Sequence, residues 1–111
     1  MWLLDVNLPT GLLAVLREYG ITCDSAANRG WRDLTNGLLA EAAFRAGFRV
    51  ILTRDRLFGD SADRVLRGLP DLALVVVVLR QARAVPYLAT FRAQWGERPI
   101  EPVAGSVIEW P

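Results

Sequence analysis

The chain of 111 residues has the length of a single domain, residues 1–111, and a domain of this size buries about 65% of its unfolded surface. A hydrophobic fraction of 52% and a mean hydropathy of +0.24 exclude a disordered chain. No apolar run reaches the roughly 18 residues that a membrane span needs. The start, Met-Trp-Leu-Leu-Asp, has no basic or long apolar segment of a signal peptide, so we expect a cytoplasmic protein.

Missing residue types exclude several kinds of chemistry. The chain contains no histidine, which removes Ser-His-Asp and Cys-His catalysis and histidine-ligated zinc. The one cysteine, Cys23, cannot form an internal disulfide and is interpreted as a small buried hydrophobe. All 13 basic residues are arginines, which suit bidentate phosphate contacts. The base composition of the genome is the simpler explanation of that bias, and a net charge of +1 does not indicate nucleic-acid binding.

The first half of the chain alternates strand and helix signals. Residues 1–6 are apolar up to Asp5 and predict a buried strand. Pro9 opens a helical pattern that ends at Gly20, and residues 21–24 predict a short second strand. Residues 25–35 read as a loop, after which Thr35 or Asn36 can cap a helix that ends at Gly47.

The second half continues the same alternation. Residues 48–53 predict a third strand, and residues 61–69 predict a short helix capped by Asp60 or Ser61. Residues 72–79 contain four successive valines, and an unbroken run of this kind is typical of a strand covered on both faces. Residues 86–95 predict a fourth helix, and residues 103–110 predict a last strand.

This alternation predicts an α/β fold in one three-layer domain, with a five-stranded parallel sheet and helices on both faces. The simplest strand order is 2-1-3-4-5, which places the first and third strands side by side at the switch point. In open α/β sheets, ligands bind outside the carboxyl ends of the strands at that point.

Two acids follow the strands that should meet there. Asp5 ends the first strand and Asp55 follows the third. Two neighbouring carboxylates repel each other unless they are protonated, separated or bridged by a cation. Asp5, Asp55 and the amide oxygen of Asn7 could supply the oxygen ligands of one Mg²⁺, which could then polarise a phosphate. The simpler alternative for each aspartate, and for Asn7 ahead of Pro9, is a turn or a helix cap.

Other polar and aromatic residues are weaker candidates. Asp60 could join the metal ligands but could equally cap a helix, and Asp63 suits a first helical turn. Arg54 and Arg56 flank Asp55 and could bind a phosphate or form surface salt bridges. An aromatic stripe at helical spacing predicts core packing rather than a base-stacking platform; its members are Tyr87, Phe91 and Trp95.

The residues resemble a known family at two places. The first motif is Leu3-Leu4-Asp5-x-Asn7-Leu8-Pro9, which resembles the opening of short bacterial PIN-like proteins. The second is Leu52-Thr53-Arg54-Asp55 followed by Phe58, which resembles their second signature. The motifs cover residues 1–65, and the remainder matches in element order only. A receiver domain has a similar element order but needs a lysine at a later strand end, and this chain has none.

The resemblance implies a PIN-like fold and a Mg²⁺- or Mn²⁺-dependent ribonuclease acting on RNA. It also implies the toxin of a type II toxin–antitoxin pair, neutralised by a small DNA-binding antitoxin. Asp5 and Asp55 match the family's acids and Asn7 its asparagine. At two further positions where the family commonly has acids, this chain has Asn36 and Leu57. Asn36 can still offer a neutral oxygen.

Two functional hypotheses follow. The first is a metal-dependent endoribonuclease that uses Asp5 and Asp55, and the second is a non-catalytic PIN-like module that binds a protein partner or RNA. Trp31, in the long loop, and Trp110, near the carboxyl terminus, are expected to be exposed. Exposed aromatics mark interfaces, so we expect a homodimer or an antitoxin complex through one of these patches.

Overall fold

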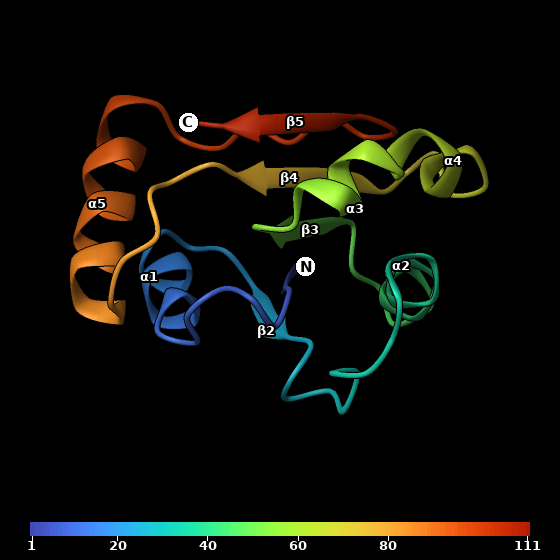
Figure 1. Cartoon of the computed structure of the whole chain (residues 1–111), viewed down its shortest axis with the longest axis horizontal. Helices are drawn as coiled ribbons and strands as arrows, with labels where there is room; N and C mark the ends of the chain where they lie inside the picture. Colours follow the sequence, from blue (N-terminus) through green and yellow to red (C-terminus); the bar gives the residue numbers. More distant parts are fainter.

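The computed structural model describes residues 1–111 and contains a five-stranded, entirely parallel sheet. The strand order is β2-β1-β3-β4-β5, which confirms the predicted arrangement (Figure 1). The strands are shorter than the apolar runs that predicted them. Their bounds are β1 Trp2–Leu4, β2 Cys23–Ser25, β3 Val50–Thr53, β4 Ala73–Val77 and β5 Val107–Trp110.

Helices cover both faces of the sheet, so the domain has three layers (Figure 1). The five helices are α1 Leu12–Glu18, α2 Asn36–Arg45, α3 Arg56–Asp60, α4 Ala62–Arg67 and α5 Ala84–Glu97. α1 and α5 pack into one buried cluster, whereas α2, α3 and α4 pack into a second. No helix is long and apolar enough to cross a membrane.

The first three residues of the valine run lie in β4, which pairs with β3 on one side and β5 on the other; Val78 follows the strand and is half-buried. Every residue of β4 is buried. Val75 and Val77 belong to the cluster under α1 and α5, while Leu74 belongs to the cluster under α2, α3 and α4. Burial on both faces explains why this strand shows no alternation of apolar and polar residues.

The segment between β3 and β4 differs from its prediction. The short helix α3 was not expected, and Asp60 is its last residue rather than the cap of α4. The side chain of Asp55 accepts a hydrogen bond from the backbone N–H of Leu57 and starts α3 directly after the strand. Gly59 lets α3 approach the sheet, since a Cβ atom there would lie 2.9 Å from Cγ2 of Val76.

The expectation that Trp110 is exposed is wrong. Trp110 is only 2% exposed. Its indole N–H donates to the backbone oxygen of Arg98 at 2.8 Å, and its ring packs against Phe91 at a centroid distance of 4.8 Å. β5 runs beside β4, so its last side chain falls under α5. Tyr87 and Phe91 of the aromatic stripe are core residues, as predicted.

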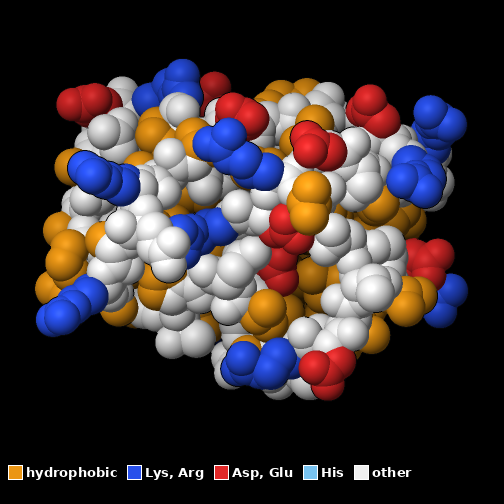
Figure 2. Space-filling model, in the orientation of Figure 1, with side chains coloured by type: hydrophobic (Ala, Val, Ile, Leu, Met, Phe, Trp, Pro, Cys, Tyr) orange, Lys and Arg blue, Asp and Glu red, His pale blue; other side chains and the backbone are white.

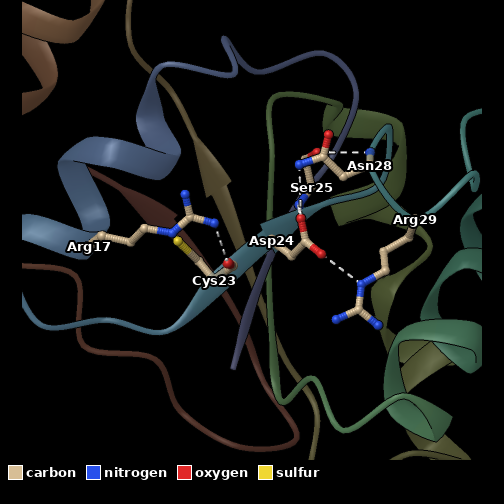
Figure 3. A network of polar contacts seen from close by, with 6 residues as sticks. All are labelled: Arg17, Cys23, Asp24, Ser25, Asn28 and Arg29. Atoms are coloured by element: carbon tan, nitrogen blue, oxygen red, sulfur yellow. Dashed lines mark hydrogen bonds and ion pairs between the residues drawn. The ribbon is translucent and has the colours of Figure 1, made fainter.

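The loop after β2 is held to the sheet by a polar network around Asp24 (Figure 3). Asp24 Oδ2 accepts from Nε of Arg29 at 2.7 Å, and Oδ1 accepts from Nδ2 of Asn28 at 3.0 Å. The guanidinium of Arg29 also lies 4.9 Å from the ring centroid of Phe48. Trp31 is half-buried, with its ring edge-on to Phe48 at 6.0 Å. The ion pair therefore fixes the loop that covers this part of the core.

The Asp24 network predicts a pH-dependent contribution to stability. The hydrogen bond from Arg29 is the main cause that lowers the pKa of Asp24 below its usual value. A lowered folded-state pKa stabilises the protein above the unfolded pKa, and this contribution is lost as the pH falls through the folded value. Asp24→Asn should lower the free energy of unfolding by about 1 kcal/mol at pH 7, and the difference should vanish as the pH falls through the lowered pKa of Asp24 in the folded protein. Urea unfolding across this range, with the exposed Asp33→Asn as control, checks both features.

Candidate active site

The candidate site lies where β1 and β3 end side by side. Leu4 of β1 is in register with Leu52 of β3, and the backbone N–H of Asp5 donates to the backbone oxygen of Leu52 at 2.9 Å. Asp5 therefore stands beside Thr53, the last residue of β3. The neighbouring strands required by the paired-acid hypothesis are present at the switch point of the sheet.

The hydroxyl of Thr53 connects the polar residues of this edge. It donates to Oδ2 of Asp5 at 2.7 Å and accepts from the backbone N–H of Asp55 at 3.0 Å. It also accepts from Nδ2 of Asn7 at 3.3 Å. A hydroxyl has one donor and two acceptor positions, so these contacts use its full capacity. Thr53 is completely buried, and the sequence analysis gave it no role.

Asp5 is a nearly buried carboxylate without a cationic partner. Its side chain is 8% exposed, and Oδ1 accepts from the backbone N–H of Val6 at 2.8 Å. The two ion pairs of the protein, Arg29 with Asp24 and Arg92 with Glu18, do not include it. Burying an unpaired carboxylate is costly, and two hydrogen bonds offset only part of that cost.

Asp55 has the capping role that was weighed as the alternative to a metal ligand. Its Oδ1 accepts from the backbone N–H of Leu57 at 2.9 Å, while Oδ2 accepts no hydrogen bond from the protein. Capping therefore leaves one oxygen for another partner. A cap and a ligand are compatible roles for this half-buried side chain.

Asn7 holds the two strand ends together instead of capping the first helix. Its Oδ1 accepts from the backbone N–H of Arg54 at 3.0 Å, and its Nδ2 reaches Thr53. The residue at the start of α1 is Gly11, without a side-chain cap. Asn7 therefore contacts Thr53 and the backbone of Arg54, and it forms no hydrogen bond with Asp5 or Asp55.

The other predicted site residues lie elsewhere on the surface. Asp60 and Arg56 line a cavity of about 390 Å³ against β4 and β5, together with Glu109. Asn36 lines a separate hollow of about 710 Å³ between α2 and α4, beside Ser61 and Arg64. None of these side chains forms a hydrogen bond with Asp5 or Asp55.

The acid edge offers two carboxylates, those of Asp5 and Asp55, to a divalent metal. No three or more Asp, Glu, Cys or His side chains form a group that could hold a metal, so Asp60 does not complete a triad with Asp5 and Asp55. Mg²⁺ is often bound through one or two carboxylates, with water and substrate phosphates as the other ligands. Asp5 and Asp55 offer the hard oxygen atoms that Mg²⁺ and Mn²⁺ prefer.

Arg54, next to Asp55 in the chain, lies beside Tyr87, and both side chains lack a polar partner. Cζ of Arg54 lies 5.4 Å from the ring centroid of Tyr87. The hydroxyl of Tyr87 is buried without a hydrogen-bond partner. Burial raises the pKa of Tyr87, and the nearby charge of Arg54 opposes this change. The stripe pattern predicted the burial of Tyr87, but no sequence signal indicated its unpaired hydroxyl.

Comparison of the chain with protein-family models, curated proteins and solved structures finds no match.

The Thr53 hydroxyl yields a first prediction for this edge. Thr53→Val keeps the shape of the side chain but leaves Oδ2 of Asp5 without its donor. The free energy of unfolding should fall by about 2 kcal/mol, because a buried acceptor loses its partner. Thr53→Ser retains the hydroxyl and should recover most of the loss. Urea unfolding of both variants measures the effect, and equal stabilities for Val and Ser would contradict it.

Tyr87 yields the opposite prediction. The hydroxyl of Tyr87 loses its hydration on folding and gains no hydrogen bond in return. Tyr87→Phe removes this unfavourable burial, so the free energy of unfolding should rise by about 1 kcal/mol. Thermal unfolding measures the change. A clear loss of stability would mean that the hydroxyl has a partner within the folded chain.

Proposed function

We propose that this chain is a PIN-like, metal-dependent endoribonuclease and the toxin of a type II toxin–antitoxin pair. The observation that carries the proposal is the Thr53 hydroxyl, which joins the side chain of Asp5 to the backbone N–H of Asp55 between two adjacent parallel strands. The two motifs of the resemblance contain these residues. Their position at the switch point of the sheet is the usual place for a ligand in an open α/β fold.

In this proposal Asp5 and Asp55 hold the metal, with Asn7 fixing the strand ends. Bound Mg²⁺ or Mn²⁺ would supply Lewis-acid stabilisation of the charge that develops on a phosphodiester. The protein supplies a fixed carboxylate at Asp5, whose rotation is restricted by two hydrogen bonds. Asp55 offers the oxygen that is not used in capping α3. Arg54 and Arg56 flank Asp55 and offer positive charge to the RNA.

The number of acids favours the second candidate, a non-catalytic PIN-like module. Only two acids meet at the strand ends, and one of them already caps a helix. Such a module would use the same edge to bind RNA or a protein partner. The two candidates differ in one measurable property, which is metal-dependent cleavage.

The toxin proposal also includes a partner and a location. A small DNA-binding antitoxin would cover the acid edge, where Val6 and Leu57 are 41% and 73% exposed. Exposed apolar side chains beside a polar site suit a protein interface. The proposal also includes a homodimer as a second assembly and a cytoplasmic location, where the RNA substrate would be found.

Replacing one acid tests the catalytic proposal. Asp5→Asn keeps the size of the side chain but removes its charge, so Mg²⁺-dependent RNA cleavage should fall at least about 100-fold. The test measures cleavage of labelled RNA across a Mg²⁺ and Mn²⁺ titration, with circular dichroism to confirm folding. Asp71→Asn, an exposed acid in the turn before β4, is the matched control.

Two results would overturn the catalytic proposal. Cleavage that survives Asp5→Asn would have another origin. A wild-type protein that cleaves no RNA, and whose thermal midpoint does not respond to Mg²⁺, would be the non-catalytic module.

A further inference from the structure

Arg54 is a cation without a countercharge at the edge of the candidate site. Its backbone N–H is fixed by Oδ1 of Asn7, which sets the direction in which the side chain leaves β3. The guanidinium is half-buried over Tyr87 and takes part in neither of the two ion pairs. A guanidinium cannot lose its proton in a protein. The charge is therefore permanent, and this position favours an anion.

Tyr87 supplies a second unpaired donor at the same place. The residue is 1% exposed, and its hydroxyl has no hydrogen-bond partner. Buried polar atoms are nearly always paired, so an exception calls for a cause. The guanidinium of Arg54 lies 5.4 Å from the centroid of the Tyr87 ring, so the two unpaired donors are neighbours. An anion bound by Arg54 could then accept a hydrogen bond from the Tyr87 hydroxyl as well.

The surrounding edge carries positive charge and exposed apolar side chains. Arg80 and Arg83 are exposed in the segment that joins β4 to α5. β4, which precedes this segment, pairs with β3. Val85, in the first turn of α5, is 79% exposed. Figure 2 shows acidic side chains near the middle of the face, where β3 passes into α3, with arginines beside them. Negative and positive groups thus alternate across one continuous surface.

We propose that Arg54 and Tyr87 form a phosphate-binding subsite for single-stranded RNA, beside the acid pair. Two N–H groups of Arg54 can donate to one phosphate, and the hydroxyl of Tyr87 adds a donor from a second direction. The donors of Arg54 and Tyr87 approach from different directions. The oxygens of a tetrahedral phosphodiester diverge and can meet both, whereas the two oxygens of a carboxylate lie in one plane. The choice of RNA as the ligand rests on the proposed function. The subsite would bind the phosphate adjacent to the phosphate that faces Asp5 and Asp55.

The subsite can be tested without catalysis. Binding of a fluorescein-labelled single-stranded oligouridylate is measured by fluorescence anisotropy in EDTA, from about 50 to 200 mM salt. Arg54→Gln should weaken binding about tenfold and lower the slope of log affinity against log salt by about 0.7, the value for one phosphate contact on a single strand. Arg67→Gln removes the same charge from the exposed end of α4 and should stay within about twofold of wild type.

Tyr87→Phe separates the hydroxyl from the ring. It should weaken binding about threefold, as expected for one lost hydrogen bond, and leave the salt slope unchanged. The ring that supports Arg54 remains in this variant, and the protein is expected to stay folded. Tyr87→Phe with wild-type affinity would overturn the two-residue subsite.

The remaining outcomes separate the subsite from the nuclease. Equal affinities for Arg54→Gln and Arg67→Gln, or no RNA binding by the wild type, would overturn the subsite. Arg54-dependent binding of a glutamate-rich peptide in place of RNA would also overturn it, in favour of an acidic protein partner. RNA binding that depends on Arg54 and Tyr87 in a protein that never cleaves RNA would support the subsite and refute the nuclease.

Discussion

The hydroxyl of Thr53 is the contact on which the organisation of the candidate site depends. It links the ends of β1 and β3 by donating to Asp5 and by accepting from Asn7 and Asp55. Each of its three positions is used, and loss of the hydroxyl would leave Oδ2 of the buried Asp5 unpaired. The orientation of the acid at the end of β1 is therefore coupled to the backbone path that leads from β3 into α3.

This coupling makes the site rigid on one side and adaptable on the other. Asp5 is nearly buried and is bonded through both of its oxygens, whereas Asp55 keeps one oxygen without a protein donor. A divalent ligand would meet one acid in a fixed geometry and a second acid that also starts a helix. Asp55 would then cap α3 through Oδ1 and meet the ligand through Oδ2, so one carboxylate would serve both the helix and the ligand.

The sequence was sufficient for the topology and for the place of Asp5 in it. Alternating elements and the valine run of β4 predicted a parallel sheet, and the strand order then placed Asp5 next to the end of β3. Contacts that depend on side-chain geometry were not predictable. The second motif contains Thr53, but nothing in the sequence indicated that its hydroxyl would link the strand ends. The burial of Trp110 depended on which face of β5 meets α5. Likewise, the sequence could suggest that Asp60 and Asn36 belong to the candidate site. It could not show that each lines a separate hollow of the surface.

The separation of the two strands in sequence has a consequence for how the protein forms. The bond between Asp5 and Thr53 joins residues 48 positions apart, and β1 lies between β2 and β3 in the sheet. A chain emerging from the ribosome can pair β1 with β2 first, but the acid edge cannot close until the third strand has been synthesised. Closing so long a loop costs entropy before any contact compensates, and parallel pairing of distant strands slows folding. Any activity of this edge would therefore arise only after β3 has paired with β1.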